Sequence, residues 1–177
     1  MHELKKNKKS FDSQVKIYKS LRRLLLVKPF AEITVADIKA DCGISRSTFY
    51  RNYNNMVDVL DAMFEYFYNR YLVERKKQEP DKEKQLSYFF EYWVNHRDLI
   101  HIISTENEGI IKECIKRHEN PDVLDNPYLI DIRYSLLTSL LSTWSESKKE
   151  TPAEMAEMTR NVLNKNCIDL LLDLYEQ

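Results

Sequence analysis

Polar and cationic side chains crowd the segment from Ser45 to Asn52 of this 177-residue chain. Their hydroxyl, guanidinium and amide groups can hydrogen-bond to phosphate oxygens and to the edges of nucleic-acid bases. Phe49 and Tyr53 lie within or next to this run, and their spacing of four puts them on one face of a helix. We therefore expect a short helix that buries two aromatic rings and presents polar groups suited to nucleic acid.

The residues before this segment carry the capping signals of a second short helix. Thr34 can cap a helix over residues 35–42, because Asp37 stands three residues further on, as in a capping box. Gly43 follows, where a residue that tolerates a positive φ is favoured. Ser45 then supplies the N-cap of the polar helix. Two short helices joined by a turn that contains glycine are typical of a helix-turn-helix.

The segment from Ile33 to Leu60 resembles the DNA-binding domain of the tetracycline-repressor (TetR) family of transcriptional regulators. The family pattern has a Thr-Val start, a Gly-apolar-Ser turn, a Thr-aromatic-Tyr sequence and an acidic-Leu pair that opens a fourth helix. The residues that match it in order and spacing are Thr34, Val35, Ile38, Gly43, Ile44, Ser45, Thr48, Phe49, Tyr50, Tyr53, Asp58 and Leu60. The resemblance implies an all-helical regulator that binds double-stranded operator DNA as a homodimer.

The resemblance also implies which residues touch DNA, since the second helix of such a motif enters the major groove. We expect a phosphate on the backbone N–H of Thr34 and either a phosphate contact or a partly buried ring for Tyr50. The full expected set is Thr34, Ser45, Arg46, Ser47, Thr48, Tyr50, Arg51 and Asn52. Arg46, Ser47, Thr48 and Asn52 are the expected base-reading residues.

Two positions depart from the family's common pattern. Lys39 stands where an alanine is common, and its stem could lie along the helix contact. Met56 stands where a lysine is common at the start of the fourth helix. We expect the phosphate contact of that lysine to be missing and the basic arm Lys5–Lys9 to compensate for it.

Charge is distributed unevenly along the chain, although the formal net charge is only −1. Residues 1–56 hold 12 lysines and arginines against 5 acidic residues, and residues 57–177 hold 15 against 23. A basic end on an acidic body fits a protein that meets a polyanion at one end. A solvated surface that is merely asymmetric would give the same numbers.

Other function classes find little support. The three cysteines (Cys42, Cys114 and Cys167) are far apart and are expected to be reduced thiols, with no metal or redox role. The motifs GxSxG, HExxH, GxGxxG and the P-loop are absent from the sequence. We expect no enzyme activity, no cofactor and no metal. With no apolar signal sequence and no apolar run of about 18 residues, we expect a cytoplasmic protein without membrane contact.

The second part of the chain has helical periodicity throughout. We expect an all-α fold with a DNA-binding domain over residues 1–55 and a regulatory and dimerisation domain over 56–177, connected by a helix at 56–76. Further helices are expected near 82–96, 98–105, 108–119, 127–147 and 152–175. Glycine is scarce, at two residues, which also favours helices over a fold rich in turns.

The last two expected helices resemble those that form the dimer interface in the TetR family. The helix at 127–147 is apolar on more than one face, which suggests a second partner or a central place in the monomer core. The expected interface residues are Leu137, Leu140, Leu141, Trp144, Leu163 and Leu170.

An aromatic cluster around residues 88–93 falls where the family builds its effector pocket. It could equally be plain core. The expected pocket residues are Tyr88, Phe89, Tyr92, Trp93, His101 and Tyr134, and they suit a small apolar or aromatic effector. We therefore expect a TetR-like repressor that an effector or a partner controls. A coactivator or adaptor that uses the same scaffold for protein interaction is the alternative.

Overall fold

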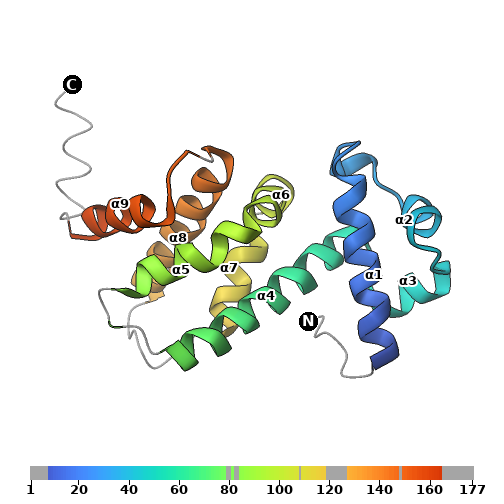
Figure 1. The fold of residues 1–177 in the computed structure, drawn as a ribbon, viewed down its shortest axis with the longest axis horizontal. Helices are drawn as coiled ribbons and strands as arrows, with labels where there is room; N and C mark the ends of the chain where they lie inside the picture. The colour runs from blue at the N-terminus through green and yellow to red at the C-terminus, as the bar shows by residue number, and fades with distance from the viewer. Residues whose placement is uncertain are drawn as a thin grey trace.

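The computed structural model describes residues 8–78, 81, 84–107, 109–118, 127–147 and 149–164. Within these ranges the chain is all-α: the regular elements are α-helices and short 3-10 helices, and no strand occurs. Three N-terminal helices gather at one end of the molecule, the helices after α4 lie at the other, and α4 runs between them (Figure 1). This arrangement confirms the expected fold class.

The N-terminal part consists of α1 (Lys8–Leu24), a 3-10 helix (Phe30–Glu32), α2 (Val35–Cys42) and α3 (Arg46–Asn52). Its core is the fully buried apolar stripe of α1, with Ile17 and Leu21, against Ile38 of α2 and Phe49 of α3. Apolar residues at helical spacing predict one helix from Phe11 to Val27, but α1 begins at Lys8, ends at Leu24 and closes in a turn. In that turn the N–H of Lys28 donates to the carbonyl of Leu24 at 3.0 Å.

Helix α4 (Met56–Gln78) leads from the motif into the rest of the chain. Its first turn is fixed by two side-chain bonds: the N–H of Asn54 donates to Asp58 at 2.8 Å, and the N–H of Asp58 donates to Asn55 at 2.9 Å. Helix α4 packs against α1, α5, α6 and α7, and its buried side chains lie between Val59 and Tyr71. Helix α4 therefore contacts both the N-terminal part and the second part of the molecule.

The second part contains α5 (Gln85–Trp93), a 3-10 helix (Val94–His96), α6 (Arg97–Asn107), α7 (Gly109–His118), α8 (Pro127–Ser147) and α9 (Pro152–Asn164). Helix α5 packs on α9, α6 on α8, and α7 on both α4 and α8. The predicted extension of the last helix to residue 175 lies outside the described residues.

Aromatic rings hold the second part together. Trp93 stacks on Phe64 of α4 with ring centroids 5.0 Å apart, and Phe90 meets Trp144 of α8 edge-on at 5.1 Å. The guanidinium of Arg97 lies 3.9 Å from the centroid of Trp144, a cation–π contact. Both tryptophans are almost fully buried, at 0% and 1% exposure, so they act as packing anchors.

The start of α9 shows how local sequence sets an element. Thr151 and Glu154 form a reciprocal cap: the N–H of Thr151 donates to the Glu154 carboxylate at 2.8 Å, and the N–H of Glu154 donates to the Thr151 hydroxyl at 3.3 Å. Pro152 occupies the first helical position, where its missing N–H costs nothing.

In the described part of the chain, no helix combines the length and the hydropathy needed to cross a bilayer.

Candidate nucleic-acid interface

The N-terminus of α2 is a closed capping box. The Thr34 hydroxyl accepts from the N–H of Asp37 at 3.3 Å, and the Asp37 carboxylate accepts from the N–H of Thr34 at 2.7 Å. The Lys28 ammonium contacts the same carboxylate at 2.6 Å. Hydrogen bonds from Lys28 and Thr34 hold the pKa of the Asp37 carboxyl well below its usual range. The N–H of Thr34, expected to bind a phosphate, is thus already bonded within the protein.

The turn between α2 and α3 depends on Gly43. Its φ is +72°, in the left-handed region, and its N–H donates to the carbonyl of Lys39 at 2.9 Å. A Cβ added there would meet no described atom within 4 Å, so the backbone conformation alone favours glycine. Ile44, next in the chain, is buried and anchors the turn.

Ser45 caps α3 and organises the hydroxyls beside it. Its Oγ accepts from the N–H of Thr48 at 3.0 Å and lies 2.8 Å from the hydroxyl of Ser47 and 2.9 Å from that of Thr48. Three hydroxyls therefore cluster at the N-terminus of α3, where the helix dipole also favours an anion.

Two aromatic rings fix the orientation of α3. Phe49 and Tyr53 are 0% and 1% exposed, which confirms that they face inward. Tyr50, on the other face, is 56% exposed. Its ring meets that of Phe49 edge-on, with centroids 5.5 Å apart. Of the two interpretations of Tyr50, a phosphate contact or a partly buried ring, its exposure fits the phosphate contact better.

Asn52 lies apart from the other expected DNA contacts. It is 3% exposed, its amide nitrogen donates to the carbonyl of Thr48 at 2.7 Å, and its amide oxygen accepts from the Ser10 hydroxyl at 2.7 Å. This side chain ties α3 to α1 instead of facing solvent. The remaining surface, called here the polar face of α3, consists of exposed Arg46, Ser47, Tyr50 and Arg51 together with half-buried Thr48.

The two departures from the family pattern leave the motif intact. Lys39 is exposed, so its stem is not needed to cover a helix contact. Met56 is half-buried and packs against the core. Arg23 of α1 forms an ion pair with Asp41 of α2, its Nε lying 3.2 Å from the carboxylate, which holds the two helices together at the surface.

The expected effector-pocket residues do not all line one space. Trp93, Phe89 and Tyr134 are buried. Tyr88 and Tyr92 line a cleft of about 420 Å³ beside α4, and the Tyr92 hydroxyl donates to a carbonyl of α4 at 2.8 Å. His101 is exposed and belongs to a different cleft. The aromatic cluster is therefore mainly core, the alternative that the sequence left open.

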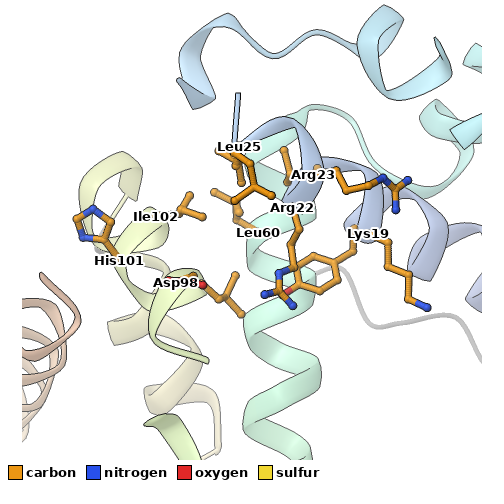
Figure 2. A pocket seen from close by; sticks show the side chains of 12 residues that line it. Lys19, Arg22, Arg23, Leu25, Leu60, Asp98, His101 and Ile102 are labelled. Atoms are coloured by element: carbon orange, nitrogen blue, oxygen red, sulfur yellow. The ribbon is translucent and has the colours of Figure 1, made fainter. Parts of the chain in front are cut away.

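The cleft that includes His101 has a volume of about 490 Å³ and lies between α1, α4 and α6 (Figure 2). Its apolar wall joins three segments, with Leu25 from the turn that follows α1, Leu60 from α4 and Ile102 from α6. The polar side chains at its rim are Lys19, Arg22, Arg23, Asp98 and His101. This cleft was not predictable from the sequence, because its walls come from three separate segments.

The expected dimer residues are split between core and surface. Leu141 and Trp144 are buried within the single chain, whereas Leu137 and Leu140 are half-buried. The side chain of Leu163 and the whole of Leu170 lie outside the described residues. Two large apolar side chains on the last two helices are instead exposed: Ile132 on α8 at 58% and Met158 on α9 at 52%.

The chain is similar to one curated protein and to one solved structure. No family model matches the sequence. The chain is 27% identical over 164 residues to the uncharacterized HTH-type transcriptional regulator YerO of Bacillus subtilis (strain 168). The match covers 86% of this chain and 54% of that protein, so the chain spans about half the length of this relative. A crystal structure of Lin0861 from Listeria innocua shares the fold, with a TM-score of 0.73, 17% identity and coverage of 90% and 93% of the two chains.

The turn glycine gives a direct test of the motif's geometry. Gly43→Ala should lower the free energy of unfolding by about 1–2 kcal/mol, because an L-residue pays a conformational penalty in the left-handed region. Gly43→Asn should cost less, since asparagine tolerates this region better than other non-glycine residues. Urea unfolding followed by circular dichroism measures both. Equal losses for the two variants would mean that the left-handed turn is not the constraint.

Proposed function

We propose that this chain is a DNA-binding transcriptional regulator of the TetR type that binds a palindromic operator as a homodimer. The observation that carries the proposal is the capped helix-turn-helix, in which buried Phe49 and Tyr53 hold α3 so that its polar face meets solvent. The similarity to an HTH-type transcriptional regulator supports the same function. Residues 1–55 would form the DNA-binding domain and 56–177 the regulatory and dimerisation domain.

The polar face of α3 divides into two kinds of contact. Arg46, Ser47 and Thr48 lie at the N-terminal end, which in this motif reaches base edges in the major groove. Tyr50 and Arg51 would bind phosphates and fix the register of the helix on DNA. Ser45 and Thr34 would act mainly by holding the two helix starts in place, since both are occupied as caps.

Arginine and tyrosine variants should separate base reading from phosphate binding. With an operator selected from a random pool, Arg46→Ala should weaken binding by about 1–3 kcal/mol and relax sequence preference, as loss of a bidentate base contact does. Tyr50→Phe should weaken all sequences alike. Fluorescence anisotropy at several salt concentrations measures these effects, and affinity should fall steeply with salt.

Arg70→Ala is the matched control for these variants, because Arg70 is an exposed arginine whose contacts, with Glu74 and the Tyr66 ring, lie within α4. Its operator affinity should equal that of the unchanged protein. Binding that survives the combined Arg46→Ala, Thr48→Ala and Tyr50→Ala changes would contradict the proposal. With a weak salt dependence, that result would favour an adaptor that works through protein contacts.

The dimer would form through the exposed apolar side chains of α8 and α9. Ile132 and Leu136 lie four residues apart on α8, and Leu140 continues the same face. Leu136 and Leu140 are half-buried and Ile132 is exposed, so this face is not fully covered within one chain. A symmetric pairing of such faces would also set the distance between the two copies of α3.

Charged residues on this face should convert a dimer to a monomer. We expect multi-angle light scattering to give a dimer for the unchanged chain at micromolar concentration, with more than about 1,200 Å² buried between the copies. Ile132→Lys combined with Met158→Lys should give a monomer that binds operator more weakly. Val73→Lys, at an exposed valine on α4, is the control and should remain a dimer. A monomeric unchanged chain would rule out this assembly.

Regulation as a repressor would use the cleft between α1, α4 and α6. Its volume lies in the range of small-molecule sites, and its apolar wall suits an apolar or aromatic effector. Because α1 belongs to the DNA-binding part and α6 to the second part, an occupant would change how the two parts pack. Such a ligand releases operator only if it binds the DNA-free arrangement more tightly.

An anilinonaphthalene sulfonate dye can probe this cleft, because it combines an aromatic body with an anionic group for the basic rim. Dye fluorescence should rise on binding, and Ile102→Trp, which fills the wall, should abolish the rise. Tyr92→Trp in the neighbouring cleft is the control and should leave it unchanged. Operator DNA should weaken dye binding by reciprocal coupling. Equal dye binding by the Ile102 variant would place the site elsewhere.

A further inference from the structure

Three potential metal ligands meet between α4 and α7, away from the polar face of α3. The Cys114 thiol donates to the Glu65 carboxylate at 3.4 Å, and Nε2 of His118 contacts the other oxygen of the same carboxylate. One ligand atom from each of the three residues lies within 4.8 Å of the other two. A thiol, an imidazole and a carboxylate in one place form a donor set that binds transition metals.

The helices fix this arrangement. Cys114 and His118 are four residues apart on α7, so their side chains lie on one face, one turn apart. Asp61 and Glu65 have the same spacing on α4, and α4 packs against α7. Each helix therefore presents two potential metal ligands toward the other helix. Arg117 bridges the acidic pair, with its guanidinium 3.2 Å from Asp61 and 2.5 Å from Glu65.

We propose that Glu65, Cys114 and His118 bind a divalent metal ion of the zinc type. In a tetrahedral zinc site, bond lengths of about 2.0–2.3 Å put neighbouring ligand atoms about 3.5 Å apart. The three ligand atoms are already within 4.8 Å, so small side-chain rotations close the site without moving either helix. A water molecule or the Asp61 carboxylate completes the coordination. The mixed sulfur, nitrogen and oxygen set favours zinc over the hard ions magnesium and calcium.

Charges also balance when a divalent ion binds. The ion displaces the Cys114 proton to solvent, so the thiolate and the two carboxylates supply three negative charges. The ion and the Arg117 guanidinium supply three positive charges, with Arg117 keeping its contact to Asp61 while Glu65 turns to the metal. The loaded cluster therefore carries no net charge, although Arg117, as a neighbouring cation, still repels the ion and competes with it for Glu65.

The surroundings suit a bound ion that enters from solvent. Cys114 is fully buried, whereas the side chains of Glu65 and His118 keep 15% and 21% exposure. Burial raises the pKa of the Cys114 thiol, and the neighbouring Glu65 carboxylate raises it further. Burial alone would raise the pKa of Glu65, but hydrogen bonds from Arg117 and His118 lower it. The Tyr68 ring, with its centroid 5.4 Å from that of His118, packs beside the imidazole.

The ordinary alternative is an ion-pair network in which Arg117 and His118 simply neutralise Glu65. The two interpretations predict different effects of removing Arg117 on metal affinity. If the cluster is only an ion-pair network, removing Arg117 destabilises it and creates no metal affinity. If it is a metal site, Arg117 competes for Glu65, so removing Arg117 strengthens metal binding. This inference does not depend on DNA binding.

The test uses the full, untagged, reduced chain with Cys42→Ala and Cys167→Ala, which leaves Cys114 as the only thiol. Zn²⁺ is titrated against a chromophoric chelator, and Co²⁺ is added as a spectroscopic probe. We expect one ion per chain and a thiolate-to-cobalt charge-transfer absorption. Cys114→Ala and His118→Gln should each weaken Zn²⁺ binding by at least about 100-fold, since losing even an outer-shell partner costs about 10–100-fold.

Arg117→Gln should bind Zn²⁺ severalfold more tightly, because it leaves all three ligands in place and removes the competing cation. Lys149→Gln, at an exposed lysine away from the cluster, is the matched control and should not change the affinity. If Cys114→Ala fails to fold, Arg117→Gln decides the question alone. Unchanged or weaker binding in Arg117→Gln, or a cobalt complex without the charge-transfer absorption, would overturn the proposal.

Discussion

The packing of α4 on both halves of the molecule is the constraint on which the other features depend. Leu60, near its start, forms part of the wall shared with α1 and α6, and Phe64, one turn later, stacks on Trp93 in the aromatic core. Glu65 then joins α4 to α7 through Cys114 and His118. One helix therefore makes the contacts that join the helix-turn-helix part of the chain to the second part.

The polar groups of the motif are divided between holding the structure and facing solvent. Thr34 and Ser45 form hydrogen bonds that cap α2 and α3. Asn52 forms hydrogen bonds within α3 and to α1. Arg46 and Tyr50 of α3 are exposed to solvent. This division fits the general need of a recognition helix, whose supporting groups must be satisfied internally so that its contact groups keep one orientation.

The helix-turn-helix was predictable because its signals are local. A capping box closes within four residues, and the Gly43 turn needs only a residue that tolerates a positive φ. Contacts between residues far apart in the chain were not predictable from such local signals. Asn52 matches a DNA-contact pattern in sequence, yet its amide oxygen accepts from Ser10, 42 residues earlier. Likewise Trp144, expected at a dimer surface, packs against Phe90 in the core.

The sequence by itself determined the all-α fold, the capped starts of α2, α3 and α9, and the inward-facing rings of α3, because periodicity and caps act over one or two turns. Only the tertiary structure decided which apolar faces are covered, where the clefts lie and which titratable groups meet. The cluster around Cys114 illustrates both contributions. The spacing of four between Cys114 and His118 is visible in the sequence. Glu65, 49 residues before Cys114, joins them only because α4 and α7 pack together.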